Sequence, residues 1–92
     1  MSQVFSNDTA RLLVEFKDYQ GGTIFPINVT LTIYDELEQV VKTVQSSQIK
    51  QDSNKYFYDY THETESNYVF EFKGTYEGYP VLCRQFVKVV FV

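Results

Sequence analysis

"KYFYDY" (residues 55–60) and "NYVFEFKGTYEGY" (residues 67–79) hold nine of the sixteen aromatic residues of this chain. In each stretch most rings recur at every second position, which places them on one face of a β-strand. The two sets are Tyr56, Tyr58 and Tyr60, and Tyr68, Phe70 and Phe72. We therefore expect two strands, joined by the polar segment 61–67, that direct their rings to the same side of a sheet to form a core.

The same period of two recurs along the rest of the chain. Leu12, Val14 and Phe16 alternate with other residues in one segment, and Val29, Leu31 and Ile33 alternate with polar residues in the next. "VVKTVQ" (residues 40–45) has a lysine in its middle, which is typical of an edge strand. "VLCRQFVKVVFV" (residues 81–92) reads as a last strand. Helical spacing is absent, so the pattern predicts an all-β chain.

Length and composition favour one domain over residues 1–92. A chain this short buries only about 60–65% of its unfolded surface, so its core must be rich in large side chains. With 43% hydrophobic and 17% aromatic residues this chain meets that need. Six or seven strands with turn residues every 8–12 positions predict an antiparallel β-sandwich of two sheets in Greek-key order.

The succession "INVTLTIYDELEQVV", "KYFYDYTH", "SNYVFEFKG" and a closing strand resembles immunoglobulin-like (Ig-like) domains of the fibronectin and macroglobulin kind. In those domains V-x-L-x-I-x-D is the second strand and a late Y-x-F-x-F is the sixth. The chain departs from them in having no cysteine pair and no tryptophan. An acidic, stand-alone domain of this type is similar to small structural proteins of bacteriophage particles. That resemblance implies a subunit of a virion that acts through protein–protein contacts.

Charge and targeting signals exclude several classes of function. The net charge is −4 and the eight basic residues are scattered, which argues against a nucleic-acid binder. No apolar run approaches the roughly 20 residues that span a bilayer, and the first residues do not form a signal peptide. Cys83 has no second cysteine with which to pair. We expect a protein that is made in the cytoplasm, binds no membrane and ends in a virion.

Catalytic and metal-binding candidates are few. His62, the one histidine, lies in a polar loop without a positioned partner, and Cys83 is expected to be a small buried hydrophobe. Asp35, Glu36 and Glu38 lack the spacing of a calcium loop and read as an acidic turn. The sequence therefore predicts no enzyme activity, no cofactor and no metal site.

Aromatic residues outside the alternating sets are the better candidates for binding. "GTYEGYP" (residues 74–80) is expected to place Tyr76 and Tyr79 in a glycine-flanked loop, where they either bind a partner or cap the end of the sandwich. Both roles stay open for these two residues. For Tyr19 and Phe25, in "DYQGGTIFP", capping is the favoured interpretation.

The C-terminal run "FVKVVFV" (residues 86–92) is apolar on both faces. Phe86 and Val90 share one face, and Val87, Val89 and Phe91 share the other. Such a strand is either central in a sheet or part of a contact with another chain, since its exposure would invite aggregation. Phe86 and Val90 are therefore candidates for burial against another subunit.

Three functional hypotheses follow. The first is a non-enzymatic structural subunit of a multi-chain assembly, most simply a bacteriophage component of the head–tail connection, tail or capsid surface, with other protein subunits or copies of itself as partners. The second is a carbohydrate-binding module that uses Tyr76 and Tyr79 as a stacking platform. The third is an assembly chaperone or adaptor that meets its partner by strand addition at "VVKTVQ".

Overall fold

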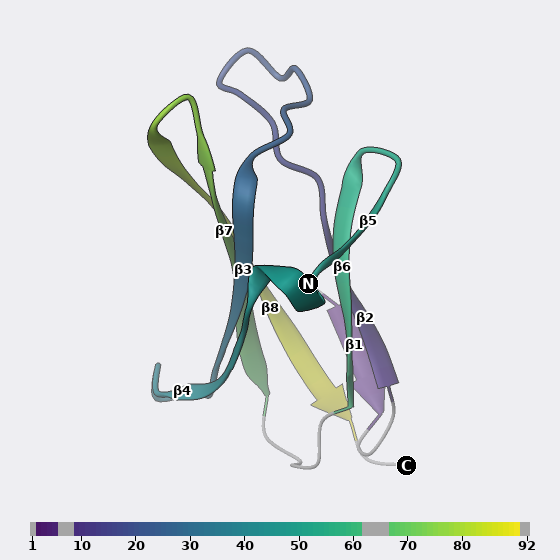
Figure 1. Ribbon diagram of the computed structural model, residues 1–92. Helices are drawn as coiled ribbons and strands as arrows, with labels where there is room; N and C mark the ends of the chain where they lie inside the picture. The colour runs from purple at the N-terminus through teal and green to yellow at the C-terminus, as the bar shows by residue number, and fades with distance from the viewer. Residues whose placement is uncertain (1, 6–8, 62–66, 91–92) are drawn as a thin grey trace.

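Strands account for most of the computed structural model of this protein, which describes residues 2–5, 9–61 and 67–90 (Figure 1). For residues 2–5 and 90 it describes the backbone alone. Within these ranges the strands are β1 (Ser2–Phe5), β2 (Thr9–Val14), β3 (Ile27–Tyr34), β4 (Val40–Val44), β5 (Lys50–Asp52), β6 (Lys55–Thr61), β7 (Tyr68–Tyr76) and β8 (Tyr79–Val90). A single turn of 3-10 helix, Ser46–Gln48, precedes β5.

The strands form two sheets that pack face to face as a sandwich, so the predicted fold class is confirmed (Figure 1). We call the five-stranded sheet, in the order β1-β8-β7-β3-β4, the large sheet, and the three-stranded sheet β2-β6-β5 the small sheet. The chain changes sheet between β1 and β2, between β2 and β3, between β4 and β5, and between β6 and β7, so the two ring-rich strands β6 and β7 lie in different sheets and not in one. As a result β7 returns beside β3 and β6 beside β2, which is the Greek-key order of immunoglobulin-like domains.

The core between the sheets is built from the alternating residues. Leu31, Ile33 and Phe72 are fully buried at its centre. Around them lie the other members of the buried cluster, which are Leu12, Val14, Phe16, Ile24, Val29, Val44, Tyr56, Tyr68, Phe70, Val87 and Val89. Phe70 and Phe72 meet edge to face with ring centroids 5.8 Å apart, a preferred aromatic geometry. The predicted inward faces of β2, β3 and β7 are thus confirmed.

The burial of side chains along strand β6 differs from the prediction. Tyr56 is buried, but Tyr58 and Tyr60 are only half-buried, and Phe57, on the opposite face, is itself 9% exposed. The guanidinium of Arg11 lies 4.1 Å from the centroid of the Phe57 ring and covers it. The ring is therefore shielded outside the core by a long side chain from β2.

The V-x-L-x-I-x-D stretch lies in a different place from the one that the resemblance suggests. It forms β3, which is hydrogen-bonded to β7 on one side and to β4 on the other. In immunoglobulin-like domains a strand with those neighbours is the third, because the second pairs within the other sheet. Here β2, which pairs with β6, takes the second place.

Strand β8 is the longest, with 12 residues, and runs along the 42 Å length of the molecule. It pairs with β7 from Tyr79 to Val87 and with β1 from Val87 to Val90. The pairing with β1 is parallel, and β1 has no counterpart in the sequence prediction. Its four residues are too few to show a period. Strand β8 therefore lies between β7 and β1 in the order of the sheet, although among its described residues only Val87 has a strand partner on both sides.

Strand β4 is an edge strand, as its lysine predicts. A β-bulge at Val41 breaks its register with β3, because Ile33 faces Lys42 while Tyr34 faces Val40. Residues 35–39, just before this strand, form a turn. The Asp35 carboxylate accepts hydrogen bonds of 2.9 Å from the backbone N–H groups of Leu37 and Gln39, which fixes the turn.

Candidate functional site: the outer face of the large sheet

Exposed apolar side chains are distributed unequally over the molecule. The described residues include ten large ones, namely Leu13, Tyr19, Phe25, Ile27, Leu37, Val40, Val41, Tyr79, Leu82 and Phe86. Six of these belong to strands of the large sheet and one, Leu13, to the small sheet. Apolar patches on a soluble protein mark contacts with other molecules. The large sheet is therefore the part of the surface to consider first.

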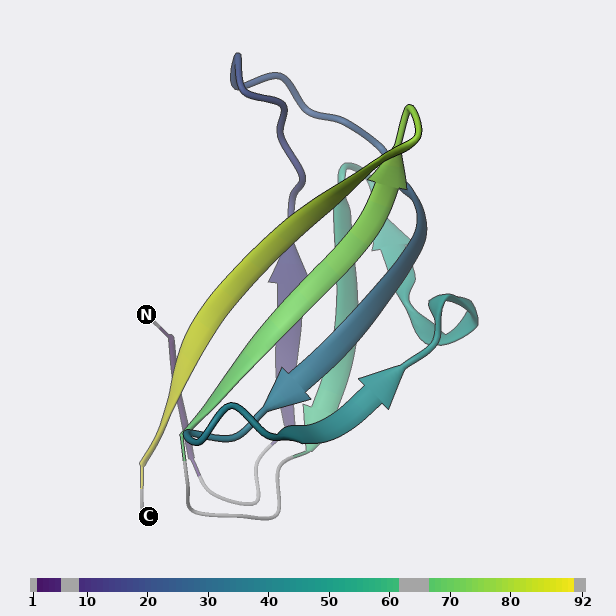
Figure 2. The same ribbon diagram turned by 90° about the vertical axis from the view of Figure 1, so that its left-hand side faces the viewer.

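A row of apolar side chains crosses four strands on the outer face of this sheet. Strand register places Phe86 of β8 opposite Val69 of β7, Val69 opposite Tyr34 of β3, and Tyr34 opposite Val40 of β4. Opposed residues in antiparallel strands share a face. Phe86 is 40% and Val40 60% exposed, whereas Tyr34 and Val69 between them are half-buried. Figure 2 views this outer face, over which no other element of the described chain passes.

A charged pair borders this row. The Arg84 guanidinium donates two hydrogen bonds to Glu71 Oε2, from Nη2 at 2.7 Å and from Nε at 3.0 Å. It also lies 5.3 Å from the centroid of the Tyr34 ring. The hydrogen bond to Glu71 raises the pKa of Arg84 above its ordinary value. Because Arg84 is engaged on two sides, it orients Tyr34 and is not a free cation for an anionic ligand.

A shallow hollow of about 300 Å³ lies at the meeting point of these side chains. Its walls are Tyr34, Val69, Arg84 and Glu38, the last from the β3–β4 turn with φ 62°. The hollow is open to solvent and shallow, unlike the enclosed sites that bury most of a small ligand. Its form suits a protruding side chain of a partner protein.

The two tyrosines of "GTYEGYP" lie in strands and not in the predicted loop. Tyr76 ends β7, Tyr79 begins β8, and they face each other across a two-residue turn. Glu77 and Gly78 in that turn have φ values of 52° and 84°, the signature of a type I′ hairpin. Tyr76 packs against the core, whereas Tyr79 is 73% exposed. Because cross-strand partners share a face, the two rings lie on the same side of the hairpin, with Tyr76 partly covered by the core and Tyr79 open to solvent.

The loop between β2 and β3 overturns one of the capping predictions. Tyr19 is 96% exposed and caps nothing, while Phe25 is about half exposed. The loop is held by Asp18 Oδ1, which accepts hydrogen bonds of 2.9 Å from the N–H groups of Gln20 and Gly22. Tyr19 thus projects from a defined turn at the end of the molecule that also carries the β7–β8 hairpin (Figure 1).

The residues of the C-terminal strand also differ in where the structure places them. Val87 and Val89 are buried in the core and Phe86 points outward, as their alternation predicts. The backbone of Val90 pairs with Phe5 of β1, and the side chain of Val90 lies outside the described part of the structure. Phe86 therefore belongs to the apolar row on the large sheet, and a contact made by Val90 stays a prediction.

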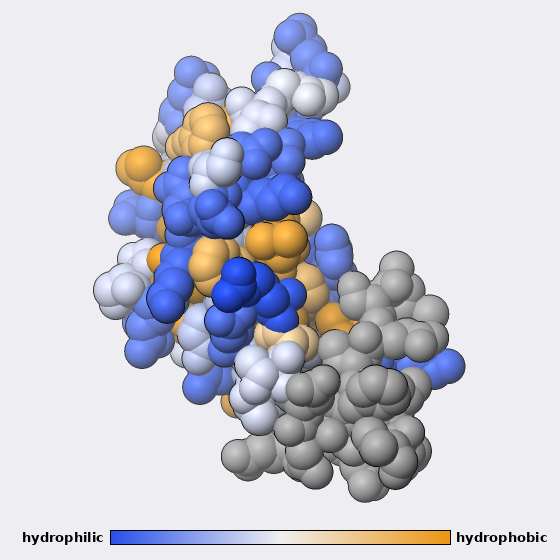
Figure 3. Space-filling model, turned by 90° about the vertical axis from the view of Figure 1, so that its right-hand side faces the viewer, coloured by the Kyte–Doolittle hydropathy of each residue, from blue (hydrophilic) through white to orange (hydrophobic). Residues whose placement is uncertain are grey.

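The outer face of the small sheet is polar and internally paired. Arg11 donates to both carboxylate oxygens of Asp59, at 2.8 and 3.2 Å, and this hydrogen bonding lowers the pKa of Asp59. The hydroxyl groups of Thr9 and Thr61 are 2.6 Å apart in the neighbouring cross-strand pair. Figure 3 shows this side of the molecule with more hydrophilic than hydrophobic residues, the hydrophobic ones lying in separate small groups. It has the character of a solvated surface.

The remaining sequence candidates are accounted for in part. His62 lies outside the described residues. Cys83 is half-buried against the core, and burial raises the pKa of its thiol, which makes the thiolate scarcer. Asp35 holds its turn, and Glu36 accepts a hydrogen bond of 2.7 Å from Asn67 Nδ2. Among the described residues no three His, Cys, Asp or Glu side chains gather as metal ligands would.

Sequence reasoning missed Tyr34, Val69 and Val40 as members of the surface row. Tyr34 and Val69 sit in strands whose alternation is visible, so their outward face was within reach, whereas Val40 has the parity of buried Val44 and faces outward because of the bulge. Their alignment depends on the register of four strands and on the bulge at Val41, which no local pattern encodes.

No protein-family model and no curated protein matches this chain. In the part of the chain that the structure describes, none of the helices has the length and apolar character needed to cross a membrane.

Proposed function

We propose that this protein is a non-enzymatic structural subunit that joins a multi-chain assembly through the outer face of its large sheet. The observation that carries the proposal is the apolar row Phe86–Val69–Tyr34–Val40, which is uncovered in the single chain. Burying such a row against another protein removes apolar surface from water, at about 25 cal/mol per Å². The small sheet offers no comparable face.

The kind of assembly rests on the sequence resemblance alone. The chain is similar in pattern to small immunoglobulin-like proteins of bacteriophage particles, and a place in the head–tail connection, tail or capsid surface agrees with an acidic, compact β-sandwich. Other subunits or copies of the same chain are the proposed partners. The competing carbohydrate-binding hypothesis keeps its two neighbouring tyrosines, but Tyr76 is partly buried against the core, so that Tyr79 alone presents most of its ring.

The test removes apolar area from the row while keeping strand propensity. The variant Phe86→Thr/Val40→Thr alters the two most exposed members of the row, and Tyr19→Thr, in the loop between β2 and β3, is the control. Threonine is favoured in strands and Tyr19 is exposed, so both variants should keep the circular dichroism of the parent. We expect the double variant to lose self-association, or its incorporation into particles of the source, while Tyr19→Thr retains it.

Native mass over a range of protein concentration, together with co-purification with particles, supplies the measurement. A parent protein that is monomeric at the highest concentration and absent from every particle would overturn the proposal. Equal losses in the double variant and the control would do the same, because the large sheet would then have no special part.

A further inference from the structure

One long side of the sandwich, between β2 and β8, is open. Among the described strands β2 pairs only with β6, and β8 has β1 as a neighbour only from Val87 onward. Two hollows of about 320 and 340 Å³ follow one another between these walls. The first lies between residues 10–13 and the pair Gln85 and Val87, and the second between residues 15–17 and 81–83. We call the two together the lateral groove.

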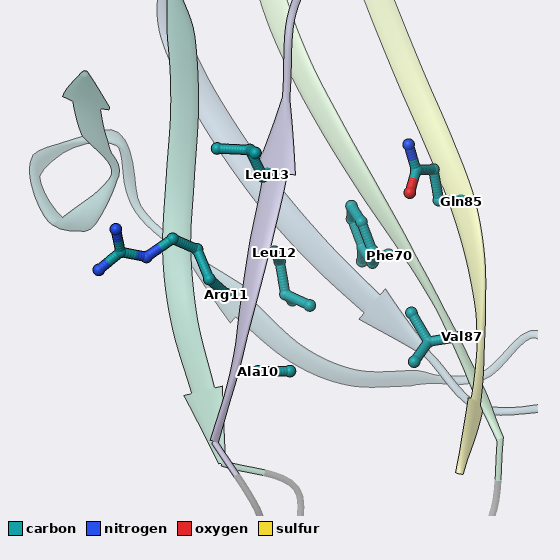
Figure 4. A pocket seen from close by; sticks show the side chains of 7 residues that line it. All are labelled: Ala10, Arg11, Leu12, Leu13, Phe70, Gln85 and Val87. Atoms are coloured by element: carbon teal, nitrogen blue, oxygen red, sulfur yellow. The ribbon is translucent and has the colours of Figure 1, made fainter. Parts of the chain in front are cut away.

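The walls and the floor of the groove offer different chemistry. Leu12, Phe70 and Val87 are core residues that form an apolar floor, and Ala10 leaves space beside them because its side chain is a single methyl group. Figure 4 shows these four side chains around the space and Arg11 turned away from it. The edge of β2 that faces away from β6 presents backbone N–H and C=O groups with none of the described strands beside them. An extended polypeptide can pair its backbone with the free edge of β2 and place apolar side chains on the floor of the groove.

Gln85 adds a polar group at the mouth of the groove. It occupies an inward position of β8, in a row with Cys83 and Val87, and yet is exposed. Its amide makes no hydrogen bond to any other described side chain or backbone group, and it can both donate and accept. A strand laid along β2 would bring peptide groups within its reach, whereas an apolar ligand would not use it.

The shape of the sandwich favours a slender occupant over a second folded copy. The large sheet is two strands wider than the small one, and β8 and β1 extend past β2 on this side (Figure 2). Two copies that paired through β2 about a two-fold axis normal to the sheet would bring both overhanging β8–β1 pairs into the same space. A single extended segment fits beneath the overhang without such a collision.

The opposite edge of the sandwich is protected in the usual way, and the groove is not. Strand β4 carries Lys42 in its middle and a bulge at Val41, two devices that discourage strand pairing. Strand β2 has neither a bulge nor a proline, and its one charged side chain, Arg11, is bound to Asp59 on the outer face. Strand β4, at which the third hypothesis places strand addition ("VVKTVQ"), is therefore a less suitable edge for this contact than β2.

We propose that the lateral groove binds an extended segment of a partner chain, which adds to β2 as a fourth strand of the small sheet. The segment has apolar side chains at alternate positions, so that these cover Ala10 and Leu12 while the polar ones face outward. This contact is separate from the outer face of the large sheet. It supplies a second way for the protein to engage an assembly.

The probe is a synthetic peptide, KTVTVTVTK, whose alternating valines meet the groove and whose lysines keep it soluble. Two matched controls have the same sequence and charge but carry N-methyl groups on alternate amides. One version blocks the hydrogen bonds of one edge of the peptide strand, and the other version blocks those of the opposite edge. We expect saturable chemical-shift changes of backbone amides confined to residues 10–17 and 81–87. At least one N-methylated version should bind about tenfold or more weakly. No shift at about 1 mM peptide, or equal binding of all three peptides, would overturn the proposal.

Two tryptophan substitutions, one at each candidate edge, locate the peptide-binding site. Gln85→Trp fills the mouth of the groove, whereas Val41→Trp places the same ring on the β4 edge. Both positions are exposed, so both variants should fold. We expect Gln85→Trp to weaken peptide binding about tenfold or more and Val41→Trp to leave it unchanged. The reverse result assigns the peptide to β4 and overturns the proposal. Retention of binding by Phe86→Thr/Val40→Thr would show that the groove acts independently of the proposed large-sheet contact.

Discussion

Tyr68 shows at the scale of one residue how this small core uses its aromatic side chains. It begins β7, is 4% exposed, and meets Tyr60 edge to face with centroids 5.4 Å apart. Burial, with a smaller contribution from Tyr60, raises the pKa of its phenol to about 12. The sequence predicts the inward face of Tyr68 because alternation is a local property. It does not predict that Tyr60 stays half-buried, because that depends on the spacing of the two sheets.

The raised pKa of Tyr68 makes the stability of the fold dependent on alkaline pH. Below pH 10 the phenol is protonated in both the folded and the unfolded chain, and its burial stabilises the fold in full. Between pH 10 and 12 the unfolded chain ionises while folded Tyr68 does not, so the free energy of unfolding falls by roughly 2–3 kcal/mol. Urea denaturation between pH 9 and 12 measures this loss.

Tyr68→Phe is the matched control, because it keeps the ring and removes the ionisable group. Its free energy of unfolding should fall less steeply over the same range. Some dependence will remain, since burial also raises the pKa of Tyr56. Identical slopes for parent and variant would contradict the burial of the phenol.

At the scale of one element, the β7–β8 hairpin explains why a glycine-flanked stretch was mistaken for a loop. Its turn has only two residues, and both Glu77 and Gly78 have positive φ. The glycine on the other side, Gly74, lies within β7. A Cβ atom there would come within 2.7 Å of Pro26 Cβ, so this glycine serves close packing and not a turn. Glycines with two different physical purposes look alike in a sequence.

The turn predicts opposite effects of two substitutions. Glu77→Asn should raise the free energy of unfolding by about 0.5 kcal/mol, because asparagine tolerates positive φ better than glutamate does. Gly78→Ala should lower it by about 1 kcal/mol, because alanine has a Cβ atom that disfavours φ of 84°. Thermal and urea unfolding measure both, with Glu77→Ala as the control for loss of the charge. If both variants shifted stability in the same direction, the turn would be of another type.

For the whole molecule, the decisive feature is that the two sheets have unequal widths. The three-stranded sheet leaves the open side that forms the lateral groove, and β1 extends the large sheet past it. Alternation predicts the sandwich and most of its core. It does not predict β1, whose strand conformation depends on β8, nor the overhang, which follows from how many strands each sheet receives. The apolar row and the groove both depend on this long-range arrangement.

Removal of residues 1–5 tests the part that β1 plays in the molecule. Without β1 the backbone of β8 from Val87 to Val90 becomes an unpaired edge next to apolar residues. We expect the midpoint of thermal unfolding to fall by at least several degrees and aggregation, followed by light scattering, to increase. An unchanged midpoint together with unchanged scattering would show that the pairing of β1 with β8 adds little.

The parallel pairing of β1 with β8 also has a consequence for the order of events during synthesis. Ser2 pairs with Val87, which lies 85 positions later in the chain. At about 5–20 residues per second, a ribosome needs roughly 4–17 s to make the intervening residues. During that interval β1 has been translated and its partner has not. Closing so distant a contact is also slow on entropic grounds. Strand β1 is thus without its partner until β8 has been made, and we expect this pairing to be among the last contacts of the large sheet to form.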